Sequence, residues 1–68
     1  MSEIKTMPLW ETLRHIEDVI KIETVYLYDQ VTLELIDIVD MDTAKEDYAY
    51  RIVRKYETNG NTVKVWLI

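Results

Sequence analysis

Asn59 and Gly60 form the sequence feature that most constrains the fold of this chain. They lie between two segments rich in strand-forming residues, 48–57 and 62–68. Asn-Gly is the preferred centre of a two-residue type I′ turn, because both central residues need a positive φ and Asn and Gly reach it at the lowest cost. The sequence therefore predicts an antiparallel hairpin that turns at Asn59-Gly60.

A turn at this position also determines which side chains of the hairpin share a face. On one face, the predicted cross-strand pairs are Tyr56 with Val63, Arg54 with Val65, and Ile52 with Leu67. On the other face, they are Lys55 with Lys64, Val53 with Trp66, and Arg51 with Ile68. Because the first face is mainly apolar, we expect a helix to cover it.

That helix is predicted over residues 8–21. Pro8 suits the first position of a helix, where its missing N–H would have no partner in any case. After Pro8, apolar side chains recur at spacings of four, three and four, which makes one face of an amphipathic helix. These side chains are Leu9, Leu13, Ile16 and Ile20.

Two further strands are predicted at residues 22–28 and 31–39. The first is rich in β-branched and aromatic residues and contains neither Gly nor Pro. In the second, apolar and polar residues alternate as in a half-buried strand, but the phase slips at Leu35-Ile36. A β-bulge at this point, or partial cover on both faces, would account for the slip.

Together these segments predict a single α+β domain over residues 1–68. Its one N-terminal helix packs on a four-stranded antiparallel meander, and residues 1–7 are expected to form a flexible leader. The strands are expected at residues 22–28, 31–39, 48–57 and 62–68.

The third strand has an alternative interpretation. Thr43 and Glu46 match a capping box, and apolar residues follow them at helical spacing. This alternative is an α-β-β-α-β fold in which residues 44–57 are helical.

The residue composition argues against an enzyme and against a bound cofactor. His15 is the only histidine, Ser2 is the only serine, and the chain has no cysteine. These residues cannot supply a nucleophile, a base and an orienting group, and without cysteine no thiolate metal site can form. The single glycine, Gly60, also argues against a glycine-rich phosphate loop. We therefore expect a non-enzymatic protein without a cofactor.

The acidic segment begins like a calcium-binding loop but does not continue as one. Asp40 and Asp42 have the spacing of the first two ligands of an EF-hand. An EF-hand loop then needs Gly at its sixth position and Glu at its twelfth, where this chain has Lys45 and Arg51. We therefore expect no metal site.

No segment has the features of an export signal or of a membrane helix. The N-terminal residues include Glu3 and Lys5 and lack the apolar run of a signal peptide. The longest uncharged stretches are far shorter than the roughly 20 apolar residues that a membrane helix needs. The sequence therefore predicts a soluble cytoplasmic protein.

The distribution of charge predicts a basic partner. The net charge is −5, and residues 29–47 alone carry seven acidic side chains and one basic one, a net charge of −6. Such an excess opposes binding to phosphate backbones and favours a basic protein surface, for example that of a nucleic-acid-binding protein that this chain would inhibit. The predicted binding residues are the acidic Glu34, Asp37, Asp40, Asp42, Glu46 and Asp47 and the apolar Ile38, Met41 and Tyr48.

Homo-oligomeric assembly is an alternative function. Residues 62–68 are apolar on both faces and carry one charged side chain, Lys64. As the last strand of a meander they would form an edge, and unprotected apolar edges invite pairing. This predicts a homodimer through Val53, Lys64, Trp66 and Ile68.

Weak binding of single-stranded nucleic acid by the C-terminal hairpin is a further alternative. Sheets that bind single strands combine exposed aromatic side chains with basic ones, and Tyr48, Tyr50 and Tyr56 lie near basic residues. In the predicted register these tyrosines face the helix, so direct nucleic-acid binding is not the expected function. In size, acidity and lack of catalytic residues the chain resembles phage-encoded accessory proteins and inhibitors, a resemblance of type that no motif carries.

Overall fold

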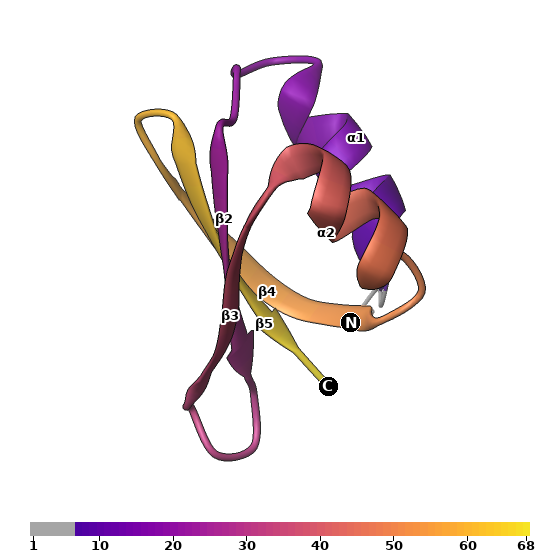
Figure 1. The fold of residues 1–68 in the computed structure, drawn as a ribbon, viewed down its shortest axis with the longest axis vertical. Helices are drawn as coiled ribbons and strands as arrows, with labels where there is room; N and C mark the ends of the chain where they lie inside the picture. The colour runs from indigo at the N-terminus through magenta and orange to yellow at the C-terminus, as the bar shows by residue number, and fades with distance from the viewer. Residues whose placement is uncertain (1–6) are drawn as a thin grey trace, which may run out of the picture.

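In the computed structural model, which describes residues 7–68, two helices pack on one face of a five-stranded mixed sheet (Figure 1). Along the chain the elements are β1 (Met7–Pro8), α1 (Leu9–Glu17), β2 (Thr24–Asp29), β3 (Leu35–Asp40), α2 (Met41–Asp47), β4 (Ile52–Asn59) and β5 (Thr62–Leu67). The strands lie in the order β1-β4-β5-β2-β3. β2 and β5 run parallel, and the other neighbouring strands run antiparallel. The predicted α+β class is confirmed.

The predicted arrangement within this class is wrong in its details. The sheet has a fifth strand, because β1 pairs with the start of β4. A second helix, α2, lies between β3 and β4. The last strand, β5, lies between β4 and β2, so the sheet is not a meander and β5 is not an edge strand. Of the predicted leader, residues 1–6 lie outside the described residues.

α1 starts directly after Pro8 rather than at it. Pro8 is the N-cap, with an extended backbone (φ −65°, ψ 154°) and no capping hydrogen bond from its side chain. The N–H groups of Leu9 and Trp10 donate instead to the carbonyls of Arg51, at 2.8 Å, and Ala49, at 3.1 Å. The loop before β4 thereby satisfies the helix start, which a capping side chain would otherwise do.

α1 ends at Glu17, four residues earlier than predicted. The N–H groups of Val19 and Ile20 both donate to the carbonyl of Ile16, at 3.0 and 2.9 Å. The chain turns tightly here and brings Ile22 into the core, where it is buried.

α2 forms between the second and third predicted strands, where the four-stranded prediction has no helix. Asp40 is its N-cap, and the Asp40 side chain accepts a hydrogen bond from the backbone N–H of Thr43 at 2.7 Å. Ala44 is fully buried in the core. The alternative with a helix over residues 44–57 is also wrong, because α2 ends at Asp47 and β4 follows.

The predicted hairpin between β4 and β5 is present, but its turn lies one residue further along the chain. Asn59 pairs with Thr62, so Gly60 and Asn61 are the central residues. Gly60 has a φ of 63° and Asn61 has no positive φ, which is the pattern of a type II′ turn. The backbone N–H of Glu23, just before β2, donates to the carbonyl of Asn61 at 2.7 Å. This contact with the parallel neighbour favours the observed turn position.

A β-bulge in β4 changes the predicted register further. The pairing shifts between Val53 and Lys55, so Val53 lies opposite Leu67 and Lys55 lies opposite Trp66. Val53 was predicted to lie on the outer face opposite Trp66, but it points into the core and is 5% exposed. None of the six predicted cross-strand pairs is formed, because Arg54 is an extra residue and the turn has moved.

The slip predicted at Leu35-Ile36 is a β-bulge. Leu27 pairs with Asp37 whereas Tyr28 pairs with Leu35, so Ile36 is the extra residue. This bulge allows apolar side chains of β3 to lie on the outer face of the sheet.

The residues that were predicted to start the second strand belong instead to the loop between β2 and β3. Asp29 Oδ1 accepts hydrogen bonds from the N–H groups of Val31, at 2.7 Å, and Thr32, at 3.2 Å. Leu33 has a φ of 62°, which is uncommon for a residue with a side chain. These contacts close a loop, so β3 begins at Leu35.

The hydrophobic core lies between the two helices and one face of the sheet. Its buried apolar side chains are Leu9, Leu13, Ile16, Ile22, Val25, Leu27, Ala44, Val53, Val63, Val65 and Leu67. No element of residues 7–68 covers the opposite face of the sheet (Figure 1). Within the same residues, neither helix has the length and apolar character that crossing a membrane requires.

Candidate interaction surfaces

The strand registers place two rows of side chains across the uncovered face of the sheet. The aromatic row consists of Lys55 on β4, Trp66 on β5, Tyr28 on β2 and Leu35 on β3. The mixed row lies beside it and consists of Glu57 on β4, Lys64 on β5, Tyr26 on β2 and Ile38 on β3. Both rows have one residue from each of the four longer strands.

Trp66 is held between its two neighbours in the aromatic row. Its ring stacks on that of Tyr28, with centroids 5.2 Å apart and an interplanar angle of 17°. The Nζ atom of Lys55 lies 4.6 Å from the centroid of the Trp66 ring. Because β5 lies between β4 and β2, Lys55 and Tyr28 approach the ring from opposite sides. An aromatic stack contributes about 0.5–1.5 kcal/mol beyond its buried area, so the stack stabilises this arrangement.

The uncovered face is apolar as well as aromatic. Leu35 and Ile38 are each 48% exposed, and Tyr26, Tyr28 and Trp66 are partly exposed. Contiguous exposed apolar side chains on a sheet are typical of an interaction surface. Sequence reasoning found only part of this surface, because the assumed register placed Val53, Trp66 and Ile68 on it as apolar residues and included no residue of β2 or β3.

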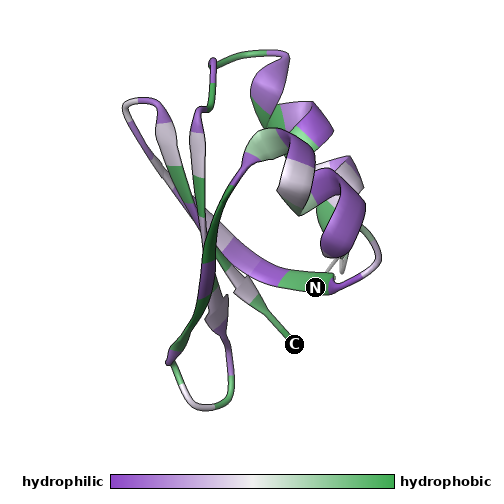
Figure 2. Ribbon diagram, in the orientation of Figure 1, coloured by the Kyte–Doolittle hydropathy of each residue, from purple (hydrophilic) through white to green (hydrophobic). Residues whose placement is uncertain are grey.

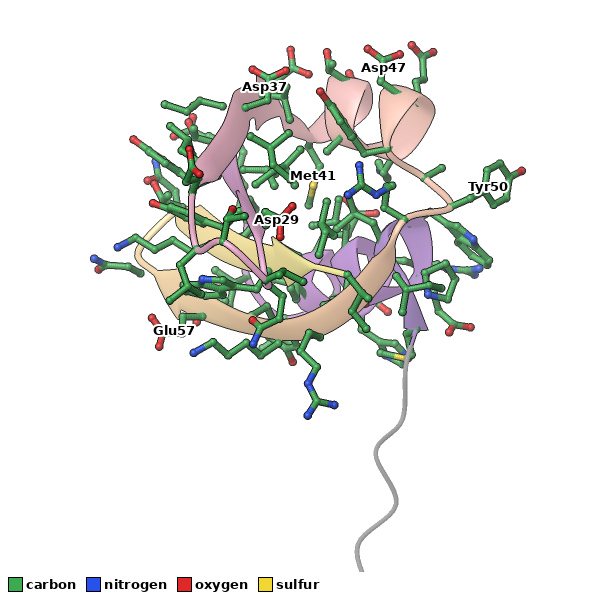
Figure 3. All side chains as sticks on the ribbon, turned by 90° about the horizontal axis from the view of Figure 1, so that it is seen from below. Asp29, Asp37, Met41, Asp47, Tyr50 and Glu57 are labelled. Carbon is green, nitrogen blue, oxygen red and sulfur yellow. The ribbon has the colours of Figure 1, made fainter. Side chains whose placement is uncertain are left out.

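The second surface is an acidic edge formed by β3 and α2. Its carboxylates are Asp37 and Asp40 on β3 and Asp42, Glu46 and Asp47 on α2. Figure 3 shows Asp37 and Asp47 along the same margin of the molecule. In Figure 2, α2 is hydrophilic over most of its length whereas β3 carries hydrophobic residues. Glu34, also predicted for this surface, lies in the loop before β3.

Two of these carboxylates have local structural roles. Asp40 caps α2, and the hydrogen bond from the backbone N–H of Thr43 lowers the pKa of Asp40. Asp37 accepts a hydrogen bond from the Tyr48 hydroxyl at 2.9 Å, which raises the pKa of Tyr48 above its ordinary value. Asp37 also accepts from the backbone N–H of Ile38 at 2.8 Å.

The α2 carboxylates are available to a partner. Asp42, Glu46 and Asp47 make no side-chain hydrogen bond or ion pair within residues 7–68. The one basic residue of the acidic edge, Lys45, is paired with Glu17 of α1 at 3.2 Å. Its charge is therefore compensated, and the edge remains negative.

The predicted apolar anchors have different environments. Ile38 lies exposed on the uncovered face, beside the acidic edge. Met41 and Tyr48 are partly buried and pack against the core. Sequence reasoning did not include Leu35 and Ile36, whose exposure depends on the β3 bulge.

The residues predicted for self-association do not all share a face. Lys64 and Trp66 lie on the uncovered face, whereas Val53 belongs to the core. Ile68 follows β5 and is exposed, and its N–H donates to the carbonyl of Ile52 at 2.9 Å.

The tyrosines considered for nucleic-acid binding lie in different places. Tyr48 contacts Asp37 at the acidic edge. Tyr50 is 86% exposed in the loop after α2 and points away from the molecule (Figure 3). Tyr56 lies on the helix side of the sheet, opposite Val65.

His15 lies in a shallow hollow on the surface of α1, beside Trp10, Glu11 and Asp18. Within residues 7–68 no group of three or more histidine or carboxylate side chains could hold a metal ion. The uncovered face and the acidic edge are therefore the features from which a function can be argued.

Comparison with models of protein families gives no match, and comparisons with curated proteins and with solved structures give none either.

Proposed function

We propose that this protein is a non-enzymatic protein-interaction module that binds a basic partner at its acidic edge. The observation that carries the proposal is the position of β3 at the edge of the sheet, with α2 and its free carboxylates directly following it. An open edge strand can accept an extended peptide as an additional strand. The acidic side chains around β3 select which peptide does so.

The sequence of β3 favours pairing with a foreign strand over pairing with a second β3. Edge strands are usually protected by Lys, Pro, β-bulges or inward-pointing charges. β3 has neither Lys nor Pro, so its protection is limited to the bulge at Ile36 and to Asp37 on the helix side. Its charges, Asp37 and Asp40, repel a second acidic edge and attract a basic one. Because Asp37 accepts from the N–H of Ile38, an incoming strand has to displace this contact.

The two faces of the sheet predict the chemistry of the bound strand. Asp37 lies opposite Leu27 on the helix side, where α2 adds its carboxylates. Leu35 and Ile38 lie on the uncovered side, opposite Tyr28 and Tyr26. A strand added to β3 would therefore alternate, with Lys or Arg toward α2 and apolar side chains beside the uncovered face.

The ionic contacts and the apolar contacts would contribute to binding in different ways. Exposed ion pairs contribute at most about 1 kcal/mol each, so the carboxylates mainly supply association rate and partner choice. Main-chain hydrogen bonds and apolar contacts supply the affinity. If the bound segment normally contacts nucleic acid, the protein would act as a competitive inhibitor by charge mimicry.

The test uses a short synthetic peptide with alternating Lys and Val, and a Glu-Val peptide as its counterpart. We expect the Lys-Val peptide to shift the backbone amide resonances of residues 35–40 in NMR spectra of the labelled protein. We expect no comparable shifts with the Glu-Val peptide. Shifts located mainly on β4, or equal binding of both peptides, would contradict the proposal.

A matched pair of charge variants separates local from overall electrostatics. Asp47→Lys changes the acidic edge, and Glu11→Lys makes the same change in net charge on α1. We expect Asp47→Lys to weaken binding of the Lys-Val peptide about fivefold, as expected for loss of a favourable contact and gain of a repulsive one. Glu11→Lys should have less effect. Equal effects of the two substitutions would mean that peptide binding depends on the overall charge of the protein and not on the acidic edge.

A further inference from the structure

The uncovered face of the sheet presents two adjacent rows of matching length. Each row has one side chain on β4, β5, β2 and β3 in turn. We propose that this face packs against the same face of a second copy of the chain, in a two-fold dimer that lays the aromatic row of each copy on the mixed row of the other. This inference does not depend on the proposed function, which uses the backbone edge of β3.

The side chains of the two rows are complementary when the rows are exchanged. A two-fold axis that runs across the strands, between the rows, brings every strand over its own counterpart. The resulting contacts are Lys55 with the partner's Glu57, Trp66 with the partner's Lys64, Tyr28 with the partner's Tyr26, and Leu35 with the partner's Ile38. They are, in order, an ion pair, the aliphatic stem of a lysine against the exposed edge of an indole ring, an aromatic pair and an aliphatic pair, and none of them brings like charges together.

Other two-fold arrangements of the same face are less favourable. An axis through the mixed row would bring Lys64 over the partner's Lys64 and Glu57 over the partner's Glu57, so like charges would meet. An axis along the strands, between β5 and β2, would lay Lys55 and Glu57 on the aliphatic side chains of the partner's β3. Burying these charges without partners is costly. Self-complementarity therefore selects the arrangement that exchanges the rows.

Two of the three charged residues of the two rows are free to make these contacts. Neither Glu57 nor Lys64 forms an ion pair within residues 7–68. Face-to-face sheets pack about 10 Å apart, which is a distance that Tyr, Trp and Lys side chains span from both sides. The second copy would also cover the sheet face that the helices leave open. This additional burial would stabilise the fold, because a domain of this size has only a small hydrophobic core.

The same geometry disfavours single-stranded nucleic acid as the occupant of this face. Bases bind such sheets by stacking on the free faces of aromatic rings. Both faces of the Trp66 ring are already occupied, one by Tyr28 and the other by Lys55. In addition, Glu57 offsets part of the positive charge of Lys55 and Lys64.

Two complementary charge reversals test the arrangement. In a homodimer of Lys55→Glu, both copies of the ion pair become repulsive contacts between carboxylates. In a homodimer of Glu57→Lys, both become repulsive contacts between ammonium groups. We expect each variant to dimerise at least about tenfold more weakly than the parent chain in sedimentation velocity experiments, since like-charge contacts in an interface are costly.

An equimolar mixture of the two variants distinguishes the interface from effects inside one chain. In the mixed dimer, one contact joins the carboxylate introduced at position 55 to the ammonium group introduced at position 57. The other contact is the parent pair of Glu57 with Lys55, so both join opposite charges and dimerisation should return to nearly the parent strength. An altered contact within one chain, such as that of Lys55 with Trp66, cannot be repaired by mixing.

Two controls accompany the mixing experiment. Circular dichroism of each variant checks that the fold is retained. Trp10→Phe leaves Trp66 as the only indole, so its fluorescence reports burial of the uncovered face.

Three results would overturn the inference. The first is a parent chain that remains monomeric at high micromolar concentration. The second is a mixture that dimerises no better than the single variants. The third is a monomeric parent chain that binds a labelled single-stranded oligonucleotide at physiological salt, which would give the uncovered face a different occupant.

Discussion

Asp40 shows how one carboxylate can be misread from sequence. Its spacing from Asp42 suggested a ligand or a partner contact, whereas its side chain caps α2 through the N–H of Thr43. The cap is visible in the sequence as an Asp three residues before a Thr. It was missed because Thr43 and Glu46 match a stronger capping pattern three residues later. Local patterns thus predicted a helix start here without deciding between two competing caps.

The cap predicts a difference between two substitutions of Asp40. Asp40→Ala removes the acceptor and should lower the denaturant midpoint, whereas Asp40→Asn keeps an acceptor and should be nearly neutral at pH 7. The hydrogen bond lowers the pKa of Asp40 below its ordinary value of 3.8, so its stabilising effect is complete above that pH and is lost as the pH falls through the folded-state pKa.

Urea denaturation of the three proteins between neutral and acidic pH checks this prediction. The stability advantage of the parent chain over Asp40→Ala should decrease below pH 3.8. A difference that is constant with pH would mean that the carboxylate charge has no role in the cap.

The hairpin of β4 and β5 shows what a turn signal can and cannot predict. Asn59 and Gly60 correctly indicated the hairpin, but the turn is centred on Gly60 and Asn61. Asn61 accepts from Glu23 next to β2, a contact that depends on a strand far away in the sequence. The bulge at Arg54 likewise depends on how Val53 packs in the core. Local sequence patterns therefore could not predict the register of this hairpin.

The positive φ of Gly60 can be tested by comparing L-alanine and D-alanine at this position. A Cβ atom at this position would meet nothing within 4 Å, so a substitution acts only through the positive φ of 63°. Gly60→Ala should destabilise the fold by about 1–2 kcal/mol, because L-residues are strained there. Replacement by D-alanine should be neutral or stabilising by about 0.4–1 kcal/mol, because it fits this φ and restricts the unfolded chain.

Both versions can be made by chemical synthesis of the 68-residue chain and compared by thermal and urea denaturation. The same loss of stability with both enantiomers would mean that the site is sensitive to the added methyl group and not to backbone conformation.

At the scale of the whole molecule, the sequence predicted the class of the fold but not the order of its strands. β5 has Val63, Val65 and Leu67 on the core face and Trp66 on the other face. This pattern was interpreted as an edge strand in need of a partner. Strands that are apolar on both faces are instead typical of the interior of a sheet, and β5 lies between β4 and β2. Because of this misassignment, the residues predicted for self-association included Val53, which lies in the core, and none of the β2 and β3 residues on the uncovered face.

The strand order predicts a ranking of amide hydrogen exchange. Amides of β5 and β2 have neighbouring strands on both sides and should exchange only with global unfolding. β3 has one neighbour, and the N–H of Ile38 donates to the exposed side chain of Asp37. The amide of Ile38 should therefore exchange much faster than that of Val65, by about 100-fold or more if opening at the edge is cheaper by about 3 kcal/mol.

NMR-detected exchange in deuterated buffer measures these rates residue by residue. The proposed dimer covers side chains and leaves the backbone edge of β3 open, so the ranking should be the same at low and high protein concentration. The Lys-Val peptide, by contrast, should slow exchange at Ile38 more than at Val65. Strand addition supplies a new acceptor at the edge, whereas Val65 is slowed only as far as binding stabilises the whole fold. Fast exchange at alternate residues of β5 would instead indicate that the last strand is an edge, and a mixed sheet with β5 between β4 and β2 would be wrong.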